Sequence, residues 1–134
     1  MQVYDLRSRP PVNRNMDLIR DLLLRIESNP EMDGTREFYL NTPEEMGISG
    51  YSTEEVAYNL GLLINAGFVD GAVTIGNPMQ VVRGLTWEGH EFLDNIKNDD
   101  IWAKTKKRFS NLSGVGLRIV AALAEAELKR HMGL

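Results

Sequence analysis

The spacing of apolar residues predicts three amphipathic helices in the first hundred residues. The first begins after Asn15, a residue type that caps helices, and it cannot continue through Ser28-Asn29-Pro30. The second lies between Ser52 and Gly67, and its opening Ser-Thr-Glu-Glu predicts a capping box. The third follows Thr86 and ends before residues 97–100. The apolar stripes are Met16, Ile19, Leu22, Leu23 and Ile26; Val56, Ala57, Leu60, Leu63 and Ile64; and Phe92, Leu93 and Ile96.

Shorter patterns between these helices predict β-structure. Residues 37–40 form a brief apolar and aromatic run, which indicates a short strand. Residues 42–45 resemble a capped helix start, but Gly47 and Gly50 limit any helix there to a turn or two. After Phe68, apolar residues on both sides of Gly76-Asn77-Pro78 predict a β-hairpin.

The order helix, short strand, short helix, longer helix, hairpin, helix is the plan of a winged helix-turn-helix domain. We therefore predict a mainly α fold with a small β-hairpin, an α+β fold, with the winged-helix domain at residues 15–97. A C-terminal helical extension at 98–134 follows, with helices at 101–109 and 117–131. Residues 1–14 are predicted to be a poorly ordered arm.

Longer motifs carry a resemblance. The segment EEVAYNLGLLINAGFVDG, residues 54–71, resembles the recognition helix and following strand of ArsR/MarR-like winged-helix regulators. NMDLIRDLLLRIE, GYSTEEVAYNLGLLINAGFVDG and LTWEGHEFLDNI, followed by Trp102 and KTK, resemble a family of small phage and prophage proteins that is defined only as a domain of unknown function. This resemblance covers residues 15–134. It implies a winged-helix-like fold in a mobile-element setting and assigns no activity.

Charge is divided unevenly along the chain. The net charge is −4, but residues 1–100 hold 8 Lys and Arg against 17 Asp and Glu, whereas residues 101–134 hold 7 against 2. A basic tail on an acidic body indicates either a polyanionic partner or self-association, although solvation alone also explains it. Candidate nucleic-acid contacts are Arg7, Arg9, Arg14, Lys104, Lys106, Lys107 and Arg108.

Aromatic residues flank the second half of this basic set. Trp102 and Phe109 could stack on single-stranded bases, as aromatic residues in nucleic-acid-binding grooves do. Their spacing of seven also fits one buried helix face with the lysines in water, and we favour that interpretation.

The predicted recognition helix is a poor match to DNA. No Lys or Arg lies between Ser52 and Gly67, and Glu54 and Glu55 stand at the end that would approach phosphates. Tyr58 and Asn59 could contact bases, but an exposed polar helix face is the simpler explanation.

The last helix is the predicted dimer contact. Its apolar stripe includes small alanines, which permit close approach of another helix, although the helix could instead fold back on its own domain. Candidate dimer contacts are Leu117, Val120, Ala121, Ala124 and Leu128.

The stretch GLTWEGHEFLDNI offers structural roles more readily than chemistry. Trp87 is expected to be buried between hairpin and helix, and Gly89 to let two backbone segments approach closely. His90 lacks the second His or Cys that a metal site or a nucleophile pair needs. We predict no catalytic residue, no metal and no cofactor.

These observations favour a non-enzymatic, cytoplasmic protein of a bacterial host that binds other macromolecules. With no cysteine, no apolar leader and no long apolar run, neither a disulfide framework nor a membrane span is expected. The partner is predicted to be another protein or a second copy, with no small-molecule ligand evident. The alternative is a DNA-binding transcriptional regulator or a nonspecific nucleic-acid binder that uses the basic termini.

Overall fold

The computed structural model describes residues 12–40, 42–74, 80–110 and 115–134 of the 134-residue chain. In chain order the elements are α1 (Met16–Ser28), β1 (Asp33–Leu40), the 3₁₀ helix η2 (Pro43–Met46), α2 (Thr53–Asn65), β2 (Val69–Val73), β3 (Gln80–Leu85), α3 (Trp87–Ile96), α4 (Asp99–Phe109) and α5 (Leu117–His131). The α+β fold class and the predicted order of elements are confirmed.

Helix boundaries follow the predicted caps. The side chains of Asn15 and Thr86 each accept a hydrogen bond from a backbone N–H in the first turn of α1 and α3. Ser52 and Glu55 make both bonds of the capping box at α2. Thr42 makes no such side-chain bond, and the helix after it is only the four residues of η2.

The sheet has three antiparallel strands with β3 in the middle. Strands β2 and β3 are the predicted hairpin arms, and the predicted turn at 76–78 lies outside the described residues. Strand β1 begins at Asp33, earlier than predicted. Its first half is exposed and polar, so it carries no apolar signal, and its register shifts between Asp33 and Phe38.

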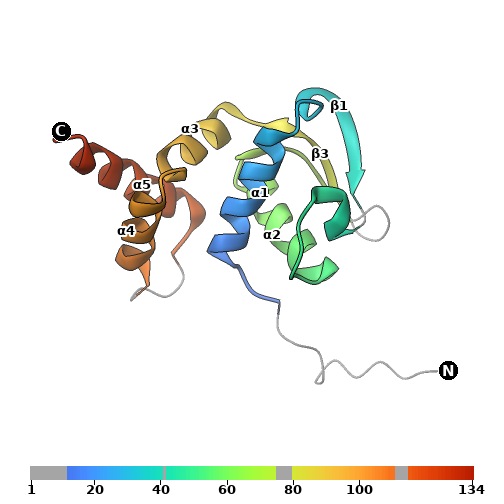
Figure 1. Cartoon of the computed structure of the whole chain (residues 1–134). Helices are drawn as coiled ribbons and strands as arrows, with labels where there is room; N and C mark the ends of the chain where they lie inside the picture. The colour runs from blue at the N-terminus through green and yellow to red at the C-terminus, as the bar shows by residue number, and fades with distance from the viewer. Residues whose placement is uncertain (1–11, 41, 75–79, 111–114) are drawn as a thin grey trace.

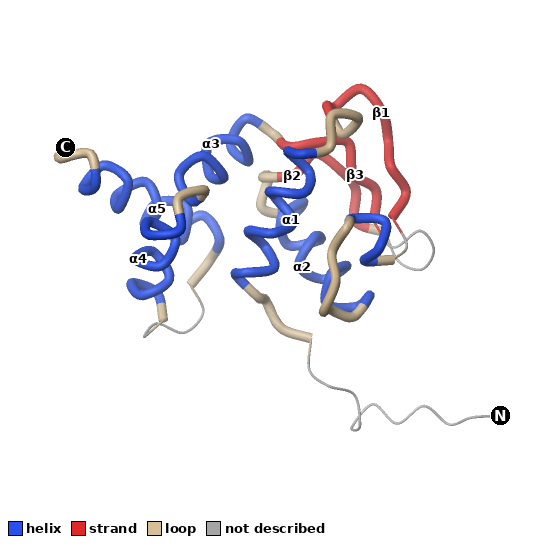
Figure 2. The backbone as a smooth tube through the Cα atoms, viewed as in Figure 1, coloured by secondary structure: helices blue, strands red, loops and turns tan. Residues whose placement is uncertain are grey.

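Helix α1 lies at the centre of the molecule, between the sheet with α2 on one side and α3, α4 and α5 on the other (Figures 1 and 2). One cluster of buried apolar side chains joins these parts. It includes Leu22 of α1 and Leu63 of α2, and also Trp102, Val120 and Ala124 beyond the predicted boundary at residue 97. The C-terminal helices therefore share the core of the preceding domain.

Gly89 sits where helix α3 meets the backbone just before strand β2. A Cβ atom at this position would lie 1.9 Å from the carbonyl oxygen of Phe68, far inside contact distance. Thr86 stabilises the same junction. Its hydroxyl donates to the Gly67 carbonyl at 2.6 Å, and its N–H donates to the Phe68 carbonyl at 3.1 Å. The predicted close approach at Gly89 is confirmed.

Candidate interaction surface

The N-terminal end of α2 is acidic, as its sequence predicts. Glu54 is exposed there and Glu55 is half-buried. Burial and the carboxylates of Asp21, Asp17 and Glu55 raise the pKa of Tyr51, just before the helix, above its usual value. A negative field therefore surrounds the end of α2 that a winged-helix protein would direct at DNA.

Asn59 can neither contact bases nor belong to an exposed polar helix face, because its side chain is completely buried. Its Oδ1 accepts from the backbone N–H of Asn15 at 2.7 Å. Its Nδ2 donates to the carbonyls of Glu55 at 2.8 Å and Asn13 at 3.2 Å. The residue fastens the segment before α1 to α2. Tyr58, its neighbour, is exposed.

The basic cluster of α4 is divided by the fold. Lys106 donates to the Asp17 carboxylate of α1 at 2.9 Å and lies 5.7 Å from the centre of the Trp102 ring. Arg108 pairs with Glu127 of α5. Lys104 and Lys107 are exposed, and neither side chain has an ion-pair partner in the part of the chain that the structure describes.

The aromatic residues of α4 face inward. Trp102 is buried, its Nε1 donates to Asp17 at 2.9 Å, and its ring centre lies 6.4 Å from that of Phe109. Trp102 is thus unavailable for stacking on bases, and the buried-face interpretation holds for it. Burial alone would raise the pKa of Asp17, but hydrogen bonds from Lys106 and Trp102 hold that pKa below its usual value.

Glu127 of α5 is a buried carboxylate that no sequence motif marks. Only 6% of its side chain is exposed, and it pairs with Arg108 and, at 3.6 Å, with Arg130. Because an unpaired buried charge is costly, both arginines have a structural role: Arg108 joins α4 to α5, and Arg130 pairs with Glu127 within α5.

The remaining basic candidates lie at the N-terminus. Arg14 is half-buried, whereas Arg7 and Arg9 lie outside the described residues.

Three of the five predicted dimer contacts belong to the chain's own core. Leu117, Val120 and Ala124 are buried, and α5 packs on α3 and α4. These side chains are already covered and cannot contact a second subunit without unfolding. This face of α5 therefore packs on its own domain, which is the alternative that the sequence left open. Ala121 and Leu128 are half-buried and line a groove on the other side of α5.

That groove, of about 620 Å³, lies between α3 and α5. Leu128, Met132 and Leu134 contribute apolar surface to it, beside the buried Phe68 and Phe92, and Trp87 also lines it with 76% of its area exposed. The predicted burial of Trp87 is therefore wrong. As the first residue of α3 it projects from the junction, and no segment of the described chain covers it.

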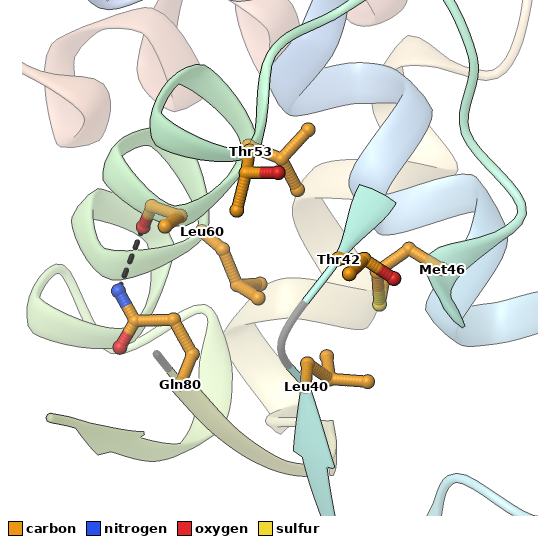
Figure 3. Close-up of a pocket in the computed structure, with 8 residues that line it drawn as sticks. Leu40, Thr42, Met46, Thr53, Leu60 and Gln80 are labelled. Carbon is orange, nitrogen blue, oxygen red and sulfur yellow. Dashed lines mark hydrogen bonds between the residues drawn. The ribbon is translucent and has the colours of Figure 1, made fainter. Parts of the chain in front are cut away.

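A second cavity lies between α2, η2 and the sheet (Figure 3). It is lined mainly by apolar residues such as Leu40, Met46 and Leu60, and its volume is about 10 Å³. Gln80 borders it and ties the hairpin to α2, donating to the Ala57 carbonyl at 2.7 Å. A space that holds at most about one water is a packing gap, too small for a metabolite.

His90 is exposed, with its Nδ1 3.9 Å from a Glu27 oxygen. Across the described ranges, no three His, Asp or Glu side chains converge as a metal site. Among the same residues, no helix is long and apolar enough to cross a membrane.

Comparison with known proteins gives a family and no activity. The family described as "Hypothetical protein (DUF2513)" matches residues 13–116. A protein of Haemophilus influenzae, described as an uncharacterized protein, is 36% identical over 104 residues, which cover 76% of this chain and 82% of that protein. No solved structure matches.

Proposed function

The chain belongs to the DUF2513 family, and we propose that it acts without catalysis, by binding another protein through the groove between α3 and α5. Its scaffold is a winged-helix-like domain that has no DNA-reading role. Its setting is the cytoplasm of a bacterial host of a phage or prophage, in keeping with the resemblance of its sequence.

The exposed Trp87 carries this proposal. Soluble proteins seldom leave so large an apolar side chain in water beside further apolar surface unless a partner covers it. Tryptophan is also enriched among the residues that contribute most to protein–protein affinity, because its ring buries a large area at little entropic cost. Here Trp87 borders a groove whose walls are two helices of the folded core, so the contact surface is rigid before binding.

The electrostatics of α2 argue against the usual use of such a scaffold. DNA affinity comes largely from Lys and Arg contacts to phosphates, and α2 has neither residue type. Glu54 at its exposed end would instead repel the backbone.

The alternative function is nucleic-acid binding through the basic termini. The observation that favours it is the exposure of Lys104 and Lys107 on one helix. The other two cationic residues of that cluster are held by Asp17 and Glu127, which reduces the charge left for phosphates.

Fluorescence anisotropy with labelled duplex and single-stranded DNA at low salt separates the two functions. We expect no binding tighter than roughly micromolar, the range of nonspecific contacts. Nanomolar binding that is lost in Lys104→Gln with Lys107→Gln would establish the alternative. These two lysines are chosen because neither has an ion-pair partner among residues 12–40, 42–74, 80–110 and 115–134.

A photo-crosslinking amino acid at position 87, in cells that produce the protein, tests directly whether a partner protein occupies the groove. We expect a discrete protein adduct from position 87 and none from position 54, which is also exposed, at the end of α2. Adducts from position 54 alone would place the protein contact on α2 and refute the use of the groove.

A further inference from the structure

Both walls of the groove are helices, α3 and α5, which pack on each other. Within a helix the backbone N–H and C=O groups bond to one another, and none of the described residues that line the groove belongs to a strand. An extended peptide would therefore lose water from its own backbone groups and find few partners for them. A helix carries its backbone hydrogen bonds with it, so the groove favours a helical segment.

The exposed apolar side chains of the groove match one face of such a helix. Trp87 on α3, and Met132 and Leu134 at the end of α5, have 76%, 63% and 82% of their areas exposed. Ala121 and Leu128, both half-buried, add apolar surface along α5. Apolar residues that recur every three or four positions form a continuous stripe on a helix. The helix that fits this groove therefore has an apolar stripe.

The cations in the α5 wall are already engaged by the chain itself. The Arg118 guanidinium donates to the carbonyl of Ala66 at 3.0 Å, and Lys129 pairs with Glu125 at 3.2 Å. This wall therefore offers little free positive charge to an acidic partner.

The α3 wall has negative charge without such compensation. Glu88 and Glu91 both line the groove and are exposed, and neither has an ion-pair partner in the part of the chain that the structure describes. In the whole lining, three glutamates stand against one arginine and one lysine, which leaves one formal negative charge. A Lys or Arg on the partner is attracted to this wall, whereas an Asp or Glu is repelled.

We propose that the groove receives an amphipathic, basic helix of a partner protein. The apolar stripe of this helix covers Trp87 and Leu128, and a Lys or Arg beside the stripe lies near Glu88 and Glu91. Burial of apolar surface supplies the affinity, and the charges select the partner. This inference rests on the proposed function, because it states the chemistry of the protein segment that the groove binds.

A second copy of the chain is a poor source of this helix. Helix α4 is the one with exposed, unpaired lysines among the described residues, at Lys104 and Lys107. Its apolar face, which includes Trp102, is buried in the core of its own copy. The helix therefore comes from a different protein.

Selection from a library of random 15-residue peptides, the length of α5, tests this chemistry with the full chain as bait. We expect the enriched peptides to have apolar residues at helical spacing and Lys or Arg beside that stripe. Fluorescence anisotropy of the labelled, enriched peptides then gives their dissociation constants. A proline placed at the middle of the peptide, on its polar face, should abolish binding because it breaks a helix.

Variants of the chain locate the contact. Trp87→Ala should weaken binding of the enriched peptides about tenfold or more, since a tryptophan at the centre of a contact contributes much of its affinity. Glu88→Lys combined with Glu91→Lys should weaken it by a similar factor, about tenfold. The matched control combines Glu31→Lys with Glu44→Lys, the same charge change at exposed positions outside the groove, and should bind as the wild type does.

Charge reversal on both sides is the decisive step. A peptide in which Glu replaces the basic residues should bind the wild type weakly. It should regain affinity for the chain with Glu88→Lys and Glu91→Lys, because opposite charges then meet again. Thermal melts of every variant establish that each is folded.

Enriched peptides that are acidic, that tolerate the central proline, or that bind Trp87→Ala as tightly as the wild type would overturn the inference. A selection that enriches nothing would do the same. So would a dimer, seen by sedimentation velocity, that Trp87→Ala dissociates, because a second copy would then occupy the groove.

The proposed function fails by a different result. If position 87 forms no protein adduct in cells, the groove binds no protein. If adducts form there but the enriched peptides are acidic or extended, the groove remains a protein-binding surface and only the basic helix is ruled out.

Discussion

Replacing the buried Asn59 by alanine should destabilise the fold far more than its place on a polar helix face suggests. The side chain is fully buried and makes three hydrogen bonds, two of which cross from α2 to the segment before α1. Asn59→Ala removes all three, and alanine has no polar atom to replace them.

The three bonds contribute unequally. The carbonyl of Glu55 lies within α2 and keeps its helical partner, so it loses little. The carbonyl of Asn13 belongs to an exposed residue and can bond to water instead. The hydrogen bond from the N–H of Asn15 contributes most, because this N–H donates to the buried Asn59 side chain and the described residues give it no second acceptor; leaving it unsatisfied costs about 1–3 kcal/mol. Adding roughly 1 kcal/mol for the space left by the amide gives about 2–4 kcal/mol in all.

Urea denaturation followed by circular dichroism measures this difference. The matched control is Asn65→Ala, which removes the same side chain from an exposed position of the same helix and should change stability by less than about 0.5 kcal/mol. Amide hydrogen exchange gives a second measure, since protection of the Asn15 N–H should fall selectively in Asn59→Ala. If the two alanine variants unfold at the same urea concentration, the bonds to the segment before α1 contribute nothing and the reasoning is refuted.

Three further predictions concern other junctions of the fold. Gly89→Ala should cost about 3 kcal/mol or more, visible as a large drop in melting temperature, because the added methyl meets backbone that cannot move independently. Arg108→Gln should cost about 1–3 kcal/mol in urea unfolding, because it leaves the buried Glu127 with only the longer pair to Arg130, whereas Lys107→Gln should stay within about 0.5 kcal/mol. Because the pKa of Asp17 is lowered in the folded chain, its carboxylate stabilises the fold at pH values above its unfolded pKa near 3.8, and this stabilisation is lost as the pH falls through the lower folded pKa. The loss of stability in Asp17→Asn, measured by urea titration, should therefore shrink below about pH 4.

Local patterns carried most of the secondary structure. The capping box of α2 involves residues three positions apart, and the apolar stripe of α1 repeats every turn, so both are readable without the fold. The first half of β1 was missed because its residues are polar and exposed, and only pairing with β3 makes them a strand. Where an element is defined by a distant partner, its own residues give little signal.

Side-chain roles were harder to predict for the same reason. Asn59 looks like any polar helix residue until residues 13–15, more than forty positions earlier, are placed over it. Trp87 illustrates the opposite error. A large apolar side chain predicts burial, but the first residue of a helix projects beyond the packed face, and here no other segment of the described chain reaches it.

Contacts within the chain engage most of the positive charges of the basic tail. Lys106 pairs with Asp17, and Arg118 donates to the carbonyl of Ala66 at the C-terminal end of α2, where helix carbonyls favour a cation. Arg108 and Arg130 hold Glu127, and Lys129 pairs with Glu125. Five of the seven cations beyond residue 100 are therefore engaged by groups of the chain itself.

Lys104 and Lys107 are left as the α4 cations available for phosphates in the described residues. Each phosphate contact steepens the logarithmic dependence of affinity on salt by about 0.9, and proteins that bind duplexes tightly make several such contacts. Two lysines on one helix give weak binding that salt removes easily. The groove, in contrast, combines rigid walls with an exposed tryptophan and further exposed apolar side chains. Its main driving force is burial of apolar surface, which salt does not screen, so association through it should persist at ionic strengths where contacts of Lys104 and Lys107 with nucleic acid are lost.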